Sequence, residues 1–280
     1  MESRIHKEPK GWSIQLINAA VLGSPIAHSL SPLIHSLAYE QLGIAAHYEA
    51  IEIKAGGLAN FLSHTDKNCL SLTMPLKEEA MKVADVVSDV AARISCGNTL
   101  SLRDGKWNLT STDVSGFDNA LKMHGIHEID SALIIGAGAT ARAAIASVSA
   151  IAKRVSVVSR SPEREAAMNK ASLIDVSYLP WKLTDELNDA ELVINATPNQ
   201  AAEFFLTGIN EPRGKLFEVL YHPWPTAISK AWSESNAPVI DGLDLLIHQA
   251  IAQVEIFSGF ACDRDLLYAK MREAAVTKLA

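Results

Sequence analysis

The sequence has no long apolar run, and this absence limits where the protein can act. No stretch approaches the ~18 apolar residues that a membrane-spanning helix needs. Segment 1–10 is polar and lacks the apolar centre of a secretory signal peptide. Internal repeats and low-complexity segments are also missing. We therefore expect a cytoplasmic globular protein whose 280 residues form one large or two moderate domains.

An excess of positive charge is missing as well. The formal net charge is -7, which argues against nucleic acid or an anionic membrane as the main partner. Hydrophobic residues make up 48% of the chain and charged residues 20%, as in globular rather than disordered proteins. A locally basic pocket for an anionic ligand is compatible with this balance.

Cysteine is scarce, and metal-binding motifs are absent. Cys69, Cys96 and Cys262 are scattered and odd in number, which predicts reduced thiols. The sequence has no Cys-x-x-Cys and no His-Glu-x-x-His motif. His124 and His127 lie three residues apart, but no further ligand cluster accompanies them. We therefore expect no metal site.

The most informative stretch that is present is a glycine turn between a predicted strand at 132–135 and a predicted helix at 143–150. Gly136 would allow a sharp turn, and Gly138 would allow a phosphate to approach closely. Ala141 stands where the third glycine of a GxGxxG fingerprint would be. Backbone N–H groups at such a helix start bind a pyrophosphate. The stretch favours a dinucleotide site, and an ordinary tight turn is the alternative.

The residues after the next predicted strand, 154–159, indicate which dinucleotide. NAD-preferring folds place Asp or Glu on the ribose about 20 residues beyond the glycines. This chain has Ser159, Arg160 and Ser161 there, with Arg164 one helical turn later. A guanidinium with neighbouring hydroxyls binds a 2′-phosphate, which an acidic residue would repel. The pattern predicts NADP rather than NAD, and a solvated loop arginine is the alternative.

The first third of the chain reads as a small α/β unit. Met74 and Pro75 open a helix that carries Lys77 in its first turn, where a positive charge is unfavourable and hints at function. An ordinary surface lysine is the alternative. Ser31 is expected to cap a helix that begins at Pro32. The other predicted elements are strands at 18–22, 46–53 and 69–73, helices at 33–42 and 57–64, and a hairpin of 95–102 with 106–111.

The rest of the chain alternates predicted strands and helices, which implies a parallel sheet covered on both faces. A helix is expected to begin at 115–118 and to lead into this part, and later strands are expected at 192–195, 216–220 and 239–240. Residues 195–198 end one of these strands and should face the cofactor crevice. The last long helix is expected at 243–257, with Gln249 beside its apolar stripe. That stripe consists of Leu246, Ala250, Val254 and Phe257.

Taken together, these stretches resemble shikimate dehydrogenase over essentially the whole chain. Each stretch alone is modest, but their occurrence in the expected order is highly specific. The stretches are residues 23–32, 71–77, 98–99, 112–113, 136–139, 159–161, 195–198, 221–226 and 242–249.

The resemblance implies NADP-dependent, reversible reduction of 3-dehydroshikimate to shikimate, a step of aromatic amino-acid biosynthesis. It implies a substrate domain at 1–113, to which 243–280 return, and a Rossmann-like NADP domain at 114–242. The partners expected are small molecules, with no nucleic acid and no membrane, and the protein is expected to be a monomer or a homodimer.

The resemblance also implies roles for individual residues. The positions of Lys77 and Asp113 form the catalytic pair in the family. The substrate's carboxylate and hydroxyls are bound at the positions of Ser29, Ser31, Thr73, Asn98 and Gln249, with Tyr221 nearby. The expected cofactor residues are Gly136, Ala137, Gly138, Ala139, Thr140, Ser159, Arg160, Ser161, Arg164, Asn195, Thr197 and Pro198.

Departures from the family pattern keep other substrates open. Ser71 and Ser111 stand where asparagine is usual, 95–97 differ from the common Gly-Ala-Val, and 199–201 lack a common glycine. The first three touch substrate-side loops, so a relative that reduces another cyclic hydroxy acid remains an alternative. An NAD-dependent quinate/shikimate dehydrogenase disagrees with Arg160. A catalytically idle shikimate-binding relative disagrees with the retained lysine and aspartate.

Overall fold

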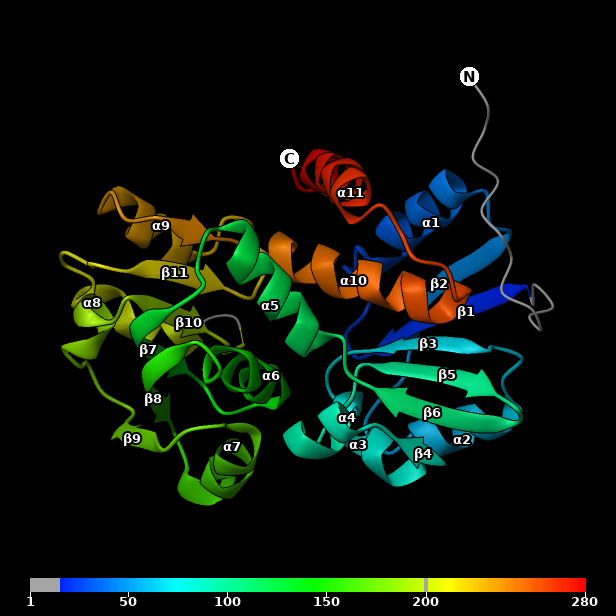
Figure 1. The fold of residues 1–280 in the computed structure, drawn as a ribbon, viewed down its shortest axis with the longest axis horizontal. Helices are drawn as coiled ribbons and strands as arrows, with labels where there is room; N and C mark the ends of the chain where they lie inside the picture. Colours follow the sequence, from blue (N-terminus) through cyan, green and yellow to red (C-terminus); the bar gives the residue numbers. More distant parts are fainter. Residues whose placement is uncertain (1–15, 199–200) are drawn as a thin grey trace.

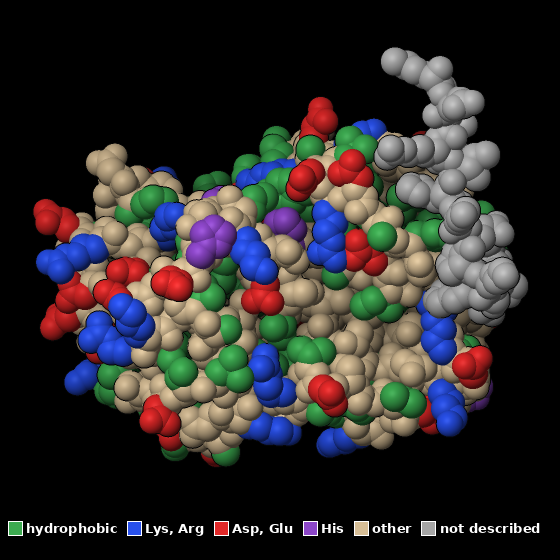
Figure 2. Space-filling model, in the orientation of Figure 1, with side chains coloured by type: hydrophobic (Ala, Val, Ile, Leu, Met, Phe, Trp, Pro, Cys, Tyr) green, Lys and Arg blue, Asp and Glu red, His purple; other side chains and the backbone are tan. Residues whose placement is uncertain are grey.

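The computed structural model describes residues 16–198 and 201–280. Two six-stranded sheets lie side by side, each with helices on both faces (Figure 1). Acidic and basic side chains are interspersed over the face that Figure 2 shows. The α/β architecture predicted from the sequence is confirmed.

The first sheet is mixed, in the order β2-β1-β3-β5-β6-β4. Strands β1, β2 and β3 pair in parallel, whereas β5 is antiparallel to both β3 and β6. The carboxyl end of β3 and the amino end of β5 therefore meet at one edge. The strands of the first sheet are β1 (Ile17–Gly23), β2 (Ala46–Glu52), β3 (Cys69–Leu72), β4 (Val86–Val87), β5 (Thr99–Arg103) and β6 (Lys106–Thr110). The helices of this part of the chain are α1 (Ser31–Leu42), α2 (Leu58–His64), α3 (Leu76–Val83) and α4 (Asp89–Ile94).

The second sheet is parallel throughout, in the order β12-β11-β10-β7-β8-β9, as predicted. The strand order reverses between β7 and β10, which makes a topological switch point there. The strands of the second sheet are β7 (Ile129–Ile135), β8 (Ala152–Ser159), β9 (Val176–Pro180), β10 (Leu192–Asn195), β11 (Lys215–Glu218) and β12 (Val239–Ile240). The accompanying helices are α5 (Asp113–Met123), α6 (Ala139–Val148), α7 (Glu165–Ala171), α8 (Glu186–Asp189) and α9 (Ala227–Glu234), with 3-10 helices η1 (Pro162–Arg164) and η2 (Ala201–Gly208).

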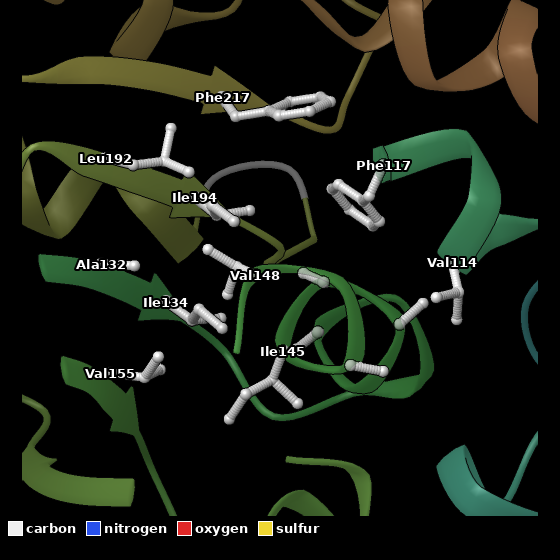
Figure 3. Close-up of a cluster of buried hydrophobic side chains, with 14 of the residues drawn as sticks. Val114, Phe117, Ala132, Ile134, Ile145, Val148, Val155, Leu192, Ile194 and Phe217 are labelled. Carbon is white, nitrogen blue, oxygen red and sulfur yellow. The ribbon is translucent and has the colours of Figure 1, made fainter. Parts of the chain in front are cut away.

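Helices α5 and α10 (Gly242–Ser258) pack against each other between the two sheets (Figure 1). Apolar residues of α5 and α6 cover one face of the second sheet, where the rings of Phe117 and Phe217 lie 5.0 Å apart (Figure 3). Helices α10 and α11 (Arg264–Leu279) pack on α1, which confirms the expected return of the C-terminal helices to the first part. The predicted apolar stripe of α10 joins the core there, with Ile34 of α1.

Helix α1 departs from the sequence prediction at its start. The helix begins at Ser31 rather than Pro32, and its N-cap residue Leu30 has helical dihedral angles. Ser31 therefore does not cap the helix. Its own backbone N–H instead donates to Oγ of Ser29 at 3.2 Å. Because Leu30 already has helical dihedral angles, the helical turn extends back into the loop. The hydroxyl that accepts a backbone N–H of the first turn therefore belongs to Ser29, earlier in that loop.

Other elements also differ from prediction. The strand expected from Ser95 begins only at Thr99, because the Ser88 side chain caps helix α4 and Ser95 ends it in a left-handed conformation. Helix α5 begins at Asp113, two residues earlier than expected, so Asp113 opens a helix rather than ending a strand. Helix α10 is not the last long helix, because α11 follows it. Asp263 caps α11 through the N–H of Leu266.

A buried histidine on α1 makes stability depend on pH. His35 is fully buried, stacks on Tyr48 with ring centroids 4.1 Å apart, and lies with Nε2 3.2 Å from Oε1 of Gln253. Burial lowers its pKa from 6.5 to about 3. The unfolded chain therefore takes up a proton below its ordinary pKa while the folded chain does not. The stabilising contribution of this group is complete above the ordinary pKa and is lost progressively as pH falls.

This linkage predicts the pH dependence of a substitution. His35→Gln should destabilise the protein at neutral pH, because it disturbs a packed core. The deficit relative to wild type should shrink by about 2 kcal/mol at about pH 5, since only the wild type carries the titrating ring. Urea unfolding at both pH values measures this, with exposed His47→Gln as the control. A deficit that stays constant with pH would contradict the neutral buried ring.

Candidate active site

A lysine and an aspartate from two helix starts form the centre of the candidate site. Lys77 is the second residue of α3, and Asp113 is the first residue of α5. The Lys77 ammonium donates to Oδ2 of Asp113 at 2.7 Å. The two side chains are only 15% and 6% exposed, so solvent screens this pair weakly. Lys77 and Asp113 lie 36 residues apart in the sequence, and the structure brings the two predicted members of the catalytic pair into contact.

An asparagine before β5 binds the other oxygen of the same carboxylate. Nδ2 of Asn98 lies 2.8 Å from Oδ1 of Asp113 and 3.1 Å from Oε1 of Gln249 on α10. Thr112 lies beside it, with its backbone N–H donating to Oδ1 of Asn98 at 2.8 Å. Asn98, Asp113 and Gln249 are all buried. Four predicted site residues from α3, α5, α10 and the start of β5 are therefore connected by hydrogen bonds.

The loop between β1 and α1 approaches the site with its hydroxyls. The Tyr221 side chain lies close to the Ser29 side chain, and burial raises the pKa of this phenol. Ser31 is buried, and its side chain lies close to Tyr48. Thr73, which precedes α3, packs so tightly on Gly23 that a Cβ there would lie 2.3 Å from Cγ2 of Thr73. Glycine at the end of β1 is thus required for this close approach.

The glycine turn after β7 leaves room for an anion. Gly136 has a φ of +109°, which side chains rarely adopt, and a Cβ there would meet the Ala196 carbonyl at 3.0 Å. A Cβ on Gly138 would lie 3.7 Å from Nη1 of Arg164, an ordinary van der Waals contact. Gly138 precedes α6, whose first turn has no side-chain cap and no acidic residue. This turn, residues 136–140, fits a phosphate group by its backbone and its helix dipole.

The predicted ribose-phosphate residues surround the end of β8. Ser159 ends the strand, and the exposed guanidinium of Arg160 lies 5.1 Å from the ring centroid of Trp181, a cation–π contact. Nη1 of Arg164 lies 3.5 Å from the Ala137 carbonyl and so reaches back to the glycine turn. The Ser161 hydroxyl accepts from the backbone N–H of Glu163 and caps η1. The Arg160 guanidinium thus contacts Trp181, and the Arg164 guanidinium contacts the glycine turn.

The end of β10 carries a buried polar cluster that faces the switch point. Nδ2 of Asn195 donates to Oε2 of Glu218 at 2.8 Å, and Oδ1 of Asn195 accepts from the Thr197 hydroxyl at 2.8 Å. The Thr226 hydroxyl donates to the same carboxylate oxygen at 3.0 Å. Burial raises the pKa of Glu218. Pro198 follows, whereas Asn199 and Gln200, the start of the departure noted at 199–201, lie outside the described residues.

Sequence reasoning missed several residues of the site. Glu218 and Trp181 belong to the cofactor side, and Tyr48 and Gln253 lie beneath the substrate side. Gln253 alone carried a readable signal, because it follows Gln249 by four residues and therefore shares its helix face. The others depend on contacts between elements that are distant in the sequence.

Residues 16–198 and 201–280 contain no group of three or more His, Cys, Asp or Glu side chains that could hold a metal ion. In the same ranges, no helix has the length and apolar character needed to cross a membrane.

Comparisons with known proteins relate the whole chain to one family. Residues 21–100 match the family model described as shikimate dehydrogenase substrate binding domain. A shikimate dehydrogenase (NADP(+)) of Methanothrix thermoacetophila is 32% identical over 264 residues, which cover 91% of this chain and 96% of the relative.

Solved structures agree with this relationship. The crystal structure of Mycobacterium tuberculosis shikimate dehydrogenase superposes with a TM-score of 0.82 at 32% identity, covering 93% of this chain and 99% of the other. The Thermus thermophilus enzyme in complex with NADP(H) and shikimate superposes with a TM-score of 0.81 at 31% identity. That alignment covers 92% of this chain and all of the other, 100%.

Proposed function

The chain belongs to the shikimate dehydrogenase family, and we propose that it catalyses the NADP-dependent, reversible reduction of 3-dehydroshikimate to shikimate. Similar proteins named shikimate dehydrogenase (NADP(+)) span nearly its full length. The protein is an oxidoreductase, and its step belongs to aromatic amino-acid biosynthesis. The resemblance drawn from the sequence is thereby confirmed at the level of the family.

The contact between Lys77 and Asp113 is the observation that supports this proposal most. Reduction of a ketone leaves an alkoxide oxygen, which must gain a proton. The Lys77 ammonium donates that proton and stabilises the developing negative charge. The Asp113 carboxylate holds the ammonium by a charge-assisted hydrogen bond at 2.7 Å. In the reverse direction the same amine accepts the proton from the hydroxyl of shikimate.

The remaining polar residues of this side hold the ring acid in place. We assign the hydroxyls of Ser29, Ser31 and Thr73 to the substrate, together with the side chains of Asn98, Tyr221 and Gln249. Neutral donors and acceptors suit a polyhydroxylated ring, and a site built around those hydroxyls rejects analogues that lack them. The hydrogen bonds of Ser31 to Ser29 and of Asn98 to Gln249 hold these four residues in place before the substrate arrives.

The residues around the second sheet fit NADP. NADPH, when bound, supplies the hydride. The uncapped start of α6 and the open space at Gly138 accept the pyrophosphate. Arg160 and Arg164, with Ser159 and Ser161, bind the 2′-phosphate. Asn195, Thr197 and Pro198 line the nicotinamide side, where Glu218 keeps the Asn195 amide in one orientation.

We also propose that different parts of the chain bind the substrate and the cofactor. Residues 1–113 bind the substrate with the help of 243–280, and residues 114–242 bind the cofactor. The boundary at Asp113 would then coincide with the catalytic carboxylate, so that α5 carries a reacting group into the junction. We further propose a cytoplasmic monomer or homodimer whose only ligands are small molecules.

One assay tests the proposal and its closest alternatives. Shikimate and quinate are offered in parallel, each with NADP and with NAD, and reduction of the nicotinamide is followed. The proposal expects turnover with shikimate and NADP to exceed the other three combinations clearly. Preference for quinate or NAD would favour the catabolic alternative. Inactivity with all four would favour another cyclic hydroxy acid or an idle relative.

A substitution at Arg160 tests the assignment of the 2′-phosphate. Arg160→Ala should weaken NADP binding by roughly 1.5–3 kcal/mol and leave NAD binding nearly unchanged, because only NADP offers a phosphate to the guanidinium. Calorimetric titration of both nucleotides measures the difference. Arg213→Ala, at an exposed arginine on the same half, is the matched control. An unchanged preference for NADP would remove Arg160 from the site.

A double-mutant cycle tests the catalytic pair. Lys77→Met should lower kcat by about 10²–10⁴-fold, the usual contribution of a proton-transfer group, while the protein still folds and binds NADP. Asp113→Asn should do similar damage, and the double variant should be little worse than either, since residues that act as a unit are not additive. Lys82→Met, at an exposed lysine of the same helix, serves as the control. Near-wild-type turnover in Lys77→Met, or fully additive losses, would contradict the pair.

A further inference from the structure

A second glutamine of α10 has all its hydrogen-bonding capacity in use beneath the candidate site. Gln253 is 1% exposed. Its Oε1 accepts from the Ser71 hydroxyl at 2.8 Å and lies 3.2 Å from Nε2 of His35. Its Nε2 donates to the Asn98 carbonyl at 3.0 Å and to the Thr99 hydroxyl at 2.9 Å. A side-chain amide has two donor hydrogens and one acceptor oxygen, so these four partners define its orientation.

The hydrogen bonds that follow all run in one direction, toward Asp113. The Thr99 hydroxyl, which accepts from Gln253, donates to Oδ1 of Asn98 at 2.8 Å. Because Oδ1 of Asn98 receives this hydrogen and the N–H of Thr112, Nδ2 of Asn98 faces the carboxylate of Asp113 at 2.8 Å. An amide turned the other way would bring two oxygens together. Gln253, Thr99 and Asn98 thus form a relay with one consistent polarity.

We propose that Gln253 and Thr99 are positioning residues for the reaction, because their relay fixes Asn98 so that its amide holds the carboxylate that binds Lys77. Neither residue reaches the reacting atoms in this scheme, and each acts through Asn98. The proposal rests on the proposed function, which assigns Lys77 and Asp113 to proton transfer. It extends that function by placing part of the catalytic geometry in the core beneath the site.

The titratable groups around Gln253 keep one charge state near neutral pH. Burial lowers the pKa of His35 to about 3, so its neutral ring donates from Nε2 to Gln253 and accepts from the Tyr39 hydroxyl at Nδ1. Burial raises the pKa of Cys69 to about 12 and also raises that of Tyr48. Arg103 of β5 donates to carbonyls at the end of α10.

Fewer titratable groups lie near Asp113, at the other end of the relay. Lys77 faces Asp113 directly, and the Cys96 thiol lies close to both, with its pKa raised by burial. Comparison of each variant with the wild type at the same pH separates a new titration at Gln253 from the effects of these groups.

The substitution Gln253→Glu introduces such a titration. When the new carboxyl group is neutral it can still donate one hydrogen bond, but when ionised it cannot donate and it repels the Asn98 carbonyl. Burial will move its ionisation above the ordinary value for glutamate. We expect the ratio of variant to wild-type kcat for shikimate oxidation to fall on the order of tenfold between about pH 5 and about pH 9. The KM for NADP should stay within about twofold, since none of the residues assigned to the cofactor belongs to the relay.

Two matched variants give the comparison its meaning. Gln253→Met keeps the volume but cannot titrate, so its kcat should be lowered by a similar factor at every pH. Gln41→Glu makes the same chemical change at an exposed position of α1 and should leave the profile unchanged. Unfolding curves at each pH correct for any loss of folded protein. A kcat ratio for Gln253→Glu that does not vary with pH, or wild-type turnover in Gln253→Met, would overturn the proposal.

Substitutions at Thr99 test the same relay without a new charge. Thr99→Val removes the hydroxyl at nearly constant volume and should lower kcat several-fold, whereas Thr99→Ser keeps the hydroxyl and should restore it. Hydrogen exchange of the Asn98 side-chain amide, followed by NMR, should be faster in Thr99→Val than in wild type or Thr99→Ser. This readout needs no turnover, so it separates failure of the relay from failure of the proposed function. Equal exchange and equal kcat in both variants would overturn the relay.

Discussion

The hydrogen-bonded ion pair of Lys77 and Asp113 is the constraint on which the arrangement of the site depends. It exists only because α3 and α5 both begin at the edge where β3 ends and β5 begins. The antiparallel pairing of these two strands brings Asn98 to the same place, and the crossing helix α10 adds Gln249. A shift of one residue in the β3–β5 register would turn the side chain of Asn98, which directly precedes β5, to the opposite face of the sheet.

The same pair links the two halves of the molecule. Helix α5 starts at the proposed catalytic carboxylate and buries Phe117 against Phe217 of the second sheet, so its position is set by the core around that sheet. Helix α10 lies against α5 along the junction and also belongs to the core of the first half. A movement of one half relative to the other would therefore change the position of Asp113. Hydride transfer and proton transfer need the substrate and the cofactor to be held in the correct mutual orientation, and α5 and α10 connect the two halves that would hold them.

Much of this could be predicted from the sequence, and the part that could not has a physical reason. The glycine turn, the parallel sheet and the lysine at a helix start follow from local rules of backbone conformation and charge. Helix α4 was missed because its cap at Ser88 was not recognised. The Ser71–Gln253–Thr99 connections escaped because partners separated by more than 150 residues leave no periodic signal. The roles of individual site residues remain predictions, whereas the family and the fold do not.

A crystal structure of the ternary complex with NADP and shikimate tests the central claim most directly. The account predicts that the reacting hydroxyl of shikimate lies within about 3 Å of the Lys77 ammonium while that ammonium still contacts Asp113. It predicts the ring carboxylate on Ser29 and Ser31, and the 2′-phosphate on Arg160 and Arg164. A ring bound with its hydroxyls away from Lys77, or a Lys77 ammonium that has left Asp113, would contradict the account.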